Sequence, residues 1–192
     1  MAKRGSYAKG VARREQILDA ALRVIAERGY RATSINELAA AVGLSQTGIL
    51  HYFDSKEALF IAVLRKRDEL DYAALQGDNP VAAIIEVVRR NAAVPGLVEL
   101  FTHMSAAAAD PQHPAHPYML ERYRAGTEYV ATALRAMQRS GSLTPDIDAM
   151  STATSLFALA DGLQVQWLLD PTVDMAAHLE RYWKQLTDHR PA

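Results

Sequence analysis

Four polar residues between positions 46 and 56 have the chemistry needed to recognise a nucleic acid: Gln46, Thr47, His51 and Lys56. The first three should be exposed on the outward face of a helix whose inward residues are Ile49, Tyr52 and Phe53. Glutamine can pair with two atoms of an adenine edge, while hydroxyl, imidazole and ammonium groups can bind bases or phosphates. This pattern predicts a DNA-reading surface, with Lys56 at the next helix start as a phosphate contact.

The residues from Thr33 to Leu59 predict the element that would hold this surface. Ser34 followed three residues later by Glu37 has the spacing of a capping box, so a helix should begin there. Gly43 can adopt the positive φ that ends a helix sharply, and a second helix should start at Ser45 or Gln46. This order is typical of a helix-turn-helix. An ordinary helical hairpin within a core is the structural alternative, and the polar outer face argues against it.

Catalytic motifs are absent from the sequence. It contains no cysteine, Gly-rich phosphate loop, H-E-x-x-H or G-x-S-x-G, so neither catalytic residues nor a cofactor are predicted. His113 and His116 lie three residues apart without a nearby third ligand, which favours a surface loop over a metal site.

The charge distribution separates a basic N-terminal third from an acidic remainder. Residues 1–67 contain twelve Lys or Arg against six Asp or Glu, a net charge of +6, and residues 68–192 carry −7. This asymmetry suits a DNA-binding head attached to a different kind of body. No apolar run approaches the roughly 20 residues of a membrane span, and no signal peptide is apparent, so we expect a cytoplasmic protein.

Hydrophobic periodicity predicts an all-α protein throughout. We expect a flexible basic arm over residues 1–10 and a bracing helix from Val11 to Arg28 before the helix-turn-helix. A long helix from about Lys56 to Leu75 should join this three-helix head to a C-terminal helical domain. The predicted domains are residues 1–55 for DNA binding, and 56–192 for ligand binding and dimerisation.

The C-terminal domain offers two further sets of candidate residues. Polar and aromatic residues among apolar ones could line a cavity for a small ligand, although plain core packing explains each one alone. These ligand candidates are His103, Met104, Tyr118, Tyr123, Phe157 and Trp167. Apolar residues surround most of the helix at 149–169, and one stripe follows the last helix, which predicts a four-helix dimer interface. The dimer candidates are Met150, Ala153, Leu156, Ala160, Leu163, Leu179, Trp183 and Leu186.

The N-terminal third resembles the TetR family of bacterial transcriptional regulators. The resemblance rests on the amphipathic helix, the helix-turn-helix and the motif F-x-S-K-E-x-L from Phe53 to Leu59. It departs from the family at Leu50, where many members have Tyr, and at Gly48, which they have one position earlier. Spacing and resemblance together give the candidate DNA contacts Lys3, Arg4, Thr33, Ser34, Asn36, Ser45, Gln46, Thr47, Gly48, Leu50, His51, Tyr52 and Lys56.

This resemblance implies a ligand-responsive regulator, most simply a repressor that binds an inverted-repeat operator as a homodimer and is released by a small molecule. Two alternatives remain at this point. One is a DNA binder that responds to no ligand. The other is a helical enzyme or carrier in which the N-terminal hairpin is only structural.

Overall fold

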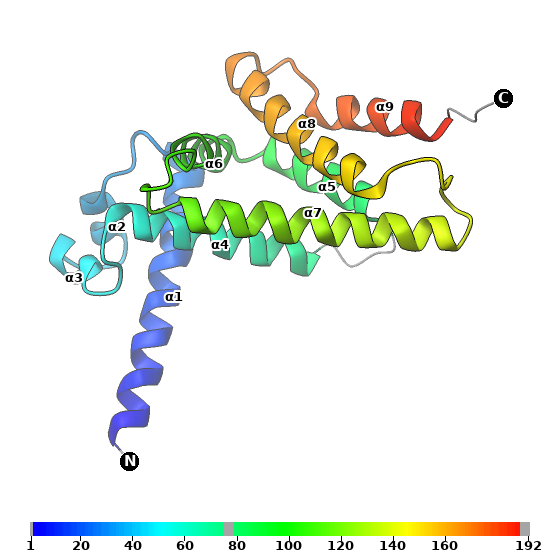
Figure 1. Cartoon of the computed structure of the whole chain (residues 1–192). Coiled ribbons are helices and arrows are strands. Elements are labelled where there is room, and N and C mark those ends of the chain that lie inside the picture. The colour runs from blue at the N-terminus through cyan, green and yellow to red at the C-terminus, as the bar shows by residue number, and fades with distance from the viewer. Residues whose placement is uncertain (1, 75–78, 189–192) are drawn as a thin grey trace. The chain divides into compact units, whose positions relative to one another are not determined.

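The computed structural model describes the backbone of residues 2–74 and 79–188, and the side chains of residues 8–71 and 79–188. The described residues form nine α-helices and no strand, which confirms the all-α prediction (Figure 1). The helices are α1 Ala2–Arg28, α2 Ile35–Ala41, α3 Gln46–Leu50, α4 Lys56–Ala74, α5 Pro80–Asn91, α6 Pro95–Ala107, α7 His116–Arg139, α8 Ala149–Leu169 and α9 Met175–Asp188.

The helices belong to two compact units. Unit 1 comprises Met1–Tyr72 and Val94–Ala115, and unit 2 comprises Ala73–Ala93 and His116–Ala192. Helix α6 therefore packs with the N-terminal helices, although α5 separates them in the chain. The predicted domains, residues 1–55 for DNA binding and 56–192 for ligand binding and dimerisation, were defined by function. These packing units do not test that division, which stays a prediction.

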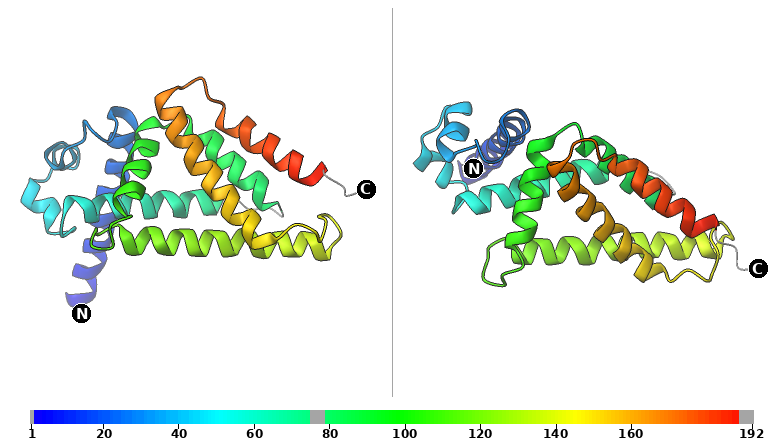
Figure 2. Two further views of the ribbon diagram at one scale, coloured as in Figure 1. Left: turned by 45° about the horizontal axis from the view of Figure 1, so that its top comes forward. Right: turned by 90° about the horizontal axis from the view of Figure 1, so that it is seen from above.

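Unit 1 is built on the apolar stripe of α1. Ile17, Ala21 and Ile25 are almost completely buried there, as the periodicity of this helix predicted. Helix α6 packs on α1, as the views in Figure 2 show. Gly96 makes this close approach possible, since a Cβ on it would lie 2.0 Å from the carbonyl oxygen of Ile25.

Unit 2 is a packed group of four helices. Helix α8 packs along α7, and α9 packs against both α5 and α8. Leu134, Leu156 and Leu179, from three different helices, are fully buried in the core. The buried residues come from only one side of each helix, so each of the four also has a face in contact with solvent.

Two helix starts differ from the sequence predictions. Helix α1 begins at Ala2, so residues 2–10 continue the bracing helix instead of forming a flexible arm. Alanine, lysine and arginine are good helix formers, which explains this extension. Asp170 followed by Pro171 is a typical helix start and predicts one there, but α9 begins at Met175, because Asp174 accepts the cap hydrogen bond from the Ala177 N–H at 2.9 Å.

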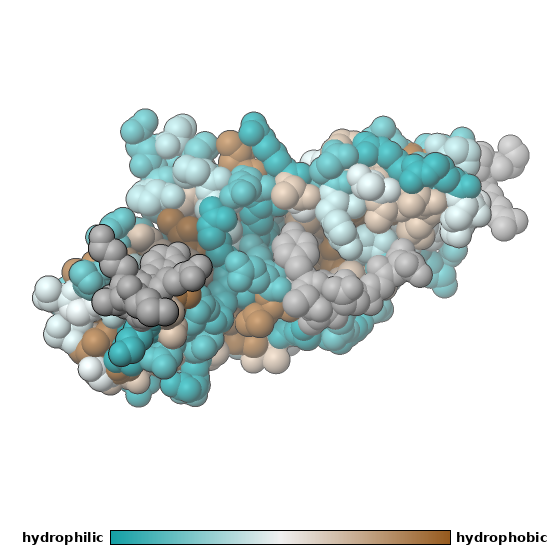
Figure 3. Space-filling model, turned by 90° about the horizontal axis from the view of Figure 1, so that it is seen from below, coloured by the Kyte–Doolittle hydropathy of each residue, from teal (hydrophilic) through white to brown (hydrophobic). Residues whose placement is uncertain are grey.

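Among the described residues, no helix is both long and apolar enough to cross a bilayer. The face drawn in Figure 3 is largely hydrophilic, and its hydrophobic residues are scattered among polar ones.

Candidate nucleic-acid interface and effector site

The helix-turn-helix forms as its local sequence predicts. Ser34 Oγ accepts from the Glu37 N–H at 3.2 Å, and the Glu37 carboxylate accepts from the Ser34 N–H at 2.7 Å, so the capping box is complete. These hydrogen bonds lower the pKa of Glu37. Gly43 adopts a φ of 66°, which ends α2, and Ser45 Oγ caps α3 by accepting from the Gly48 N–H at 3.0 Å.

Helix α3 turns one face inward and another to solvent. Ile49 is 0% exposed and fixes the helix to the core, whereas Gln46, Thr47 and His51 are exposed. Leu50 is 37% exposed on the same outer side, which is high for a large apolar residue. A short helix with an anchored inner face and exposed hydrogen-bonding groups is suited to entering a DNA groove.

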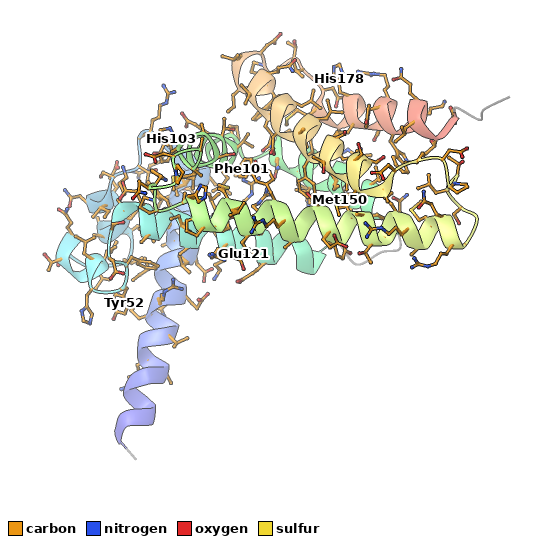
Figure 4. All side chains as sticks on the ribbon, viewed as in Figure 1. Tyr52, Phe101, His103, Glu121, Met150 and His178 are labelled. Carbon is orange, nitrogen blue, oxygen red and sulfur yellow. The ribbon has the colours of Figure 1, made fainter. Side chains whose placement is uncertain are left out.

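The remaining candidates flank α3. Asn36, Ser34 and Ser45 are exposed, while Gly48 and Tyr52 are partly buried. Figure 4 shows Tyr52 just after α3, and its ring meets that of His51 edge-on at a centroid distance of 5.5 Å.

Lys56 begins α4, where its ammonium lies 5.1 Å from the centre of the Phe60 ring. The attraction between the ammonium and the ring helps to hold the Lys56 charge at the start of α4.

One predicted DNA contact must be corrected, and two others lie outside the described side chains. Thr33 is 1% exposed, and its hydroxyl donates to the Gly29 carbonyl at 2.7 Å. Its side chain therefore stabilises the turn after α1 and is not available to a base or phosphate. The side chains of Lys3 and Arg4 lie outside the described residues, so their predicted contacts stay predictions.

Two arginines of α1 hold the helix-turn-helix in place, a role that the sequence did not reveal. The Arg13 guanidinium donates to the Val42 carbonyl at 2.6 Å, at the end of α2. The Arg14 guanidinium lies 4.7 Å from the centre of the Phe53 ring. By sequence alone, two arginines near a helix start could contact phosphates or, more commonly, remain solvated on the surface. Their partners are about 30 to 40 positions away and cannot be read from local spacing.

The six ligand candidates are divided between the two units. His103 and Met104 belong to unit 1, where His103 is exposed and its ring lies against Tyr30 at 4.9 Å. The other four belong to unit 2, where Tyr118 and Trp167 are buried. The rings of Tyr123 and Phe157 do meet, edge to face, with centroids 6.4 Å apart.

A carboxylate beside these two rings was missed by the sequence reasoning. Asp161 of α8 accepts a hydrogen bond from the Tyr123 hydroxyl at 2.6 Å and one from the Gln164 amide at 3.3 Å. Burial raises the pKa of Asp161, and the Tyr123 hydrogen bond and the nearby Arg122 charge partly oppose this rise. A single charged residue in the middle of an otherwise uncharged helix was the available signal.

Known protein families match nearly the whole of the described chain. Residues 17–63 match the model of the bacterial regulatory proteins of the tetR family, and residues 81–189 match the C-terminal model of BetI-type transcriptional repressors. The chain belongs to the TetR family of bacterial transcriptional regulators. The family expected from the sequence is thereby confirmed, and members of this family bind DNA through the helix-turn-helix.

This TetR-family chain is similar to regulators of Escherichia coli. It is 40% identical to the transcriptional regulator RutR of Escherichia coli over 82 residues, which cover 41% of this chain and 39% of RutR. The match therefore spans only about two fifths of the length of RutR. It is 27% identical to the Escherichia coli regulator UidR over 158 residues, covering 78% of this chain and 79% of UidR.

Solved structures of regulators share the fold. One is a regulator from Saccharomonospora viridis, solved in complex with choline. It is 26% identical to this chain, with a TM-score of 0.69, and the match covers 92% of this chain and 96% of that one. A TetR-family regulator from Rhodococcus has a TM-score of 0.72 at 22% identity, over 91% of this chain and 98% of that one.

The structure corrects most of the predicted dimer residues of this TetR-family chain. Five of them are at most 6% exposed and pack inside a single chain, so they cannot form a surface between two chains. These buried residues are Ala153, Leu156, Ala160, Leu163 and Leu179. Met150, Trp183 and Leu186 are partly buried, and their predicted role stays a prediction.

The described part of the chain holds no group of three or more His, Cys, Asp or Glu residues placed to bind a metal ion. His113 uses its Nδ1 to accept from the Ala115 N–H at 3.2 Å, so it helps to shape the loop before α7.

Proposed function

We propose that this chain is a repressor that binds an operator through the outer face of α3 and leaves it when a small molecule binds unit 2. The observation that carries the proposal is the anchored, capped α3 with Gln46, Thr47 and Leu50 exposed together. Membership of a family of DNA-binding regulators supports it. A protein acting in this way works where the DNA is, in the cytoplasm, and acts by binding instead of catalysis.

The exposed side chains of α3 divide into base contacts and phosphate contacts. Gln46 can donate to and accept from one adenine edge, while Leu50 and the Thr47 methyl group suit the methyl group of thymine. Lys56, at the start of α4, supplies a charge for the backbone phosphates and so contributes affinity without sequence preference.

The homodimer is best formed by the outer face of α8, in place of the buried residues first predicted. This face consists of Ser151, Thr154, Ala158, Gly162, Val165 and Leu169, all exposed and spaced three or four residues apart. Val165 is 44% exposed and Leu169 is 83% exposed. Outside its chain neighbours and the backbone of its own helix, no atom lies within 4 Å of where a Cβ on Gly162 would be. A second α8 can approach such small residues closely, with apolar contacts beside them.

A two-fold dimer predicts the form of the operator. Two identical heads related by a two-fold axis read the same sequence in opposite directions, so the operator should be an inverted repeat. Recognition helices that enter successive major grooves lie about 34–36 Å apart, or one DNA turn.

Selection from random double-stranded DNA tests this function without knowledge of the regulated genes. The purified chain should enrich an inverted repeat, and its affinity for that DNA should fall steeply with added salt. Enrichment of no common sequence would contradict sequence-specific regulation and would favour the alternative of an enzyme or carrier.

A further inference from the structure

Lys66, in the middle of α4, joins this helix to α1 through two ion pairs. Its ammonium lies 2.7 Å from a carboxylate oxygen of Glu15 and 2.7 Å from one of Asp19. Glu15 and Asp19 are four residues apart on α1, so their charges lie side by side and would repel each other without a cation between them. Burial by itself lowers the pKa of Lys66, but the hydrogen bonds and charges of Asp19 and Glu15 outweigh this effect and raise the pKa. The charged ammonium is therefore stable at this place on α1.

The part of α4 that contains Lys66 is held mainly by polar contacts. Among the described side chains of α4, Leu64 is the last that is buried, and those at 65–71 are all at least partly exposed. The neighbouring Arg67 guanidinium donates to the Leu97 carbonyl of α6 at 3.0 Å, so two adjacent cations contact two different helices. Only 16% of the Lys66 side chain and 13% of the Arg67 side chain are exposed, so water screens these contacts less than it screens an ordinary surface pair.

Helix α1 in turn contacts the segments on both sides of α3. Arg13 donates to the Val42 carbonyl, just before the turn that leads to α3. Arg14 lies over the ring of Phe53, three residues after α3 ends and three before Lys56 begins α4. The placement of α4 on α1 therefore affects where Lys56 lies relative to α3.

A base-reading helix and a phosphate contact must fit the same half-site together. Phosphate contacts fix how a protein sits on the duplex, and base contacts form only in that orientation. Binding groups need to be held within roughly 0.5 Å of their productive positions. An ion pair that fixes α4 on α1 can therefore change sequence preference without touching the DNA.

We propose that Lys66 is a positioning residue for DNA reading. Its ion pairs with Glu15 and Asp19 fix α4 on α1, and thereby the position of Lys56 relative to the exposed face of α3. This role rests on the proposed function, in which α3 reads an operator and Lys56 contacts a phosphate.

Lys66→Met tests the role, with Arg23→Met as the matched control that removes one positive charge from an exposed position of α1. Fluorescence anisotropy on the full chain measures the affinity for the selected operator and for unrelated duplex DNA of the same length. The ratio of these affinities should fall about tenfold in Lys66→Met, which is comparable to losing one base-pair contact, and should stay at the wild-type value in Arg23→Met. A loss in Lys66→Met that is equal on both DNAs would indicate a general effect of charge or folding and would overturn the proposal.

Removing the two carboxylates tests the same ion pairs from the side of α1. The double variant Glu15→Ala, Asp19→Ala makes the chain more positive, so its affinity for unrelated DNA should rise. Its preference for the operator should nevertheless fall about tenfold, and adding Lys66→Met should lower the preference little further, because the three residues act as one unit. This variant decides the question if Lys66→Met does not fold. A wild-type operator preference in the double variant would overturn the proposal.

Failure of the positioning role can be told apart from failure of the proposed function. If the wild type selects an operator and Lys66→Met keeps the full preference for it, only the positioning role is wrong. If the wild type selects no operator, the proposed function fails and the positioning role falls with it.

Discussion

Asp161 is the residue at which stability and pH should be linked most clearly. Burial raises its pKa above the ordinary value of 3.8, so folding favours the protonated carboxyl. Below the ordinary value, folded and unfolded chains both carry the proton and the stabilisation is complete. As the pH rises through the raised pKa, this stabilisation is lost.

Urea unfolding of wild type and Asp161→Asn checks this linkage. The free energy of unfolding of the Asn variant should improve relative to the wild type as the pH rises from about 3 to about 7. The sign follows from a raised pKa, since only the wild type must ionise a partly buried carboxyl. A difference that is constant with pH, or that changes in the opposite sense, would contradict the environment assigned to Asp161.

Residues whose partners are local were predictable, and residues with distant partners were not. The capping box at Ser34 and the turn at Gly43 depend on neighbours within a few positions, so the sequence predicted both. Asp161 depends on Tyr123, 38 positions away, and Arg13 depends on Val42, 29 positions away. No spacing rule reports these long-range contacts.

At the scale of elements, Gly96 sets how closely α6 can approach α1. Pro95-Gly96 reads in the sequence simply as a break between helices, whereas in the structure Gly96 lies in the first turn of α6 and faces the end of α1. A Cβ there would lie 2.0 Å from the Ile25 carbonyl oxygen and 2.8 Å from Cα of Gly29. Both atoms belong to the backbone, which cannot rotate away as a side chain can.

Gly96→Ala should therefore destabilise unit 1 by about 2 kcal/mol or more, since the two helices must move apart. Gly10→Ala is the matched control, because Gly10 lies in α1 and no atom is within 4 Å of where its Cβ would be. The control should stabilise the helix by about 0.5–1 kcal/mol through its better helix propensity. Thermal unfolding of both variants measures the effect, and equal melting temperatures would show that the α1–α6 contact is looser than described.

At the scale of the whole molecule, the dimer should depend on the outer face of α8. Ala158→Glu places a charge in the middle of that face without entering the core, because Ala158 is exposed. We expect this variant to sediment near the monomer mass of 21.1 kDa, and the wild type near twice that value. Ala125→Glu, on the exposed side of α7, should remain a dimer. A dimeric Ala158→Glu would place the interface elsewhere.

The inner and outer faces of α8 could not be separated by sequence, because apolar and small residues occur on both. Leu163 and Val165 are similar in hydrophobicity, yet the first is 4% exposed and the second 44%. Their positions follow from the packing of α7 and α9 on one side of the helix. The order of helices and the all-α class were predictable, since both follow from periodicity and breaks along the chain.

The assignment of α3 as the DNA-reading helix is tested most directly by one base-specific comparison. Fluorescence anisotropy at several salt concentrations would measure the affinity of wild type, Gln46→Ala and Lys56→Ala for the selected operator and for operators with single base changes. Gln46→Ala should lose about 1–3 kcal/mol and become indifferent to the base at one symmetric position, with its salt dependence unchanged. Lys56→Ala should weaken binding to every sequence alike and make the salt dependence shallower. If Gln46→Ala instead weakens all operators equally and keeps the full base preference, α3 does not read DNA in the way its exposed face indicates.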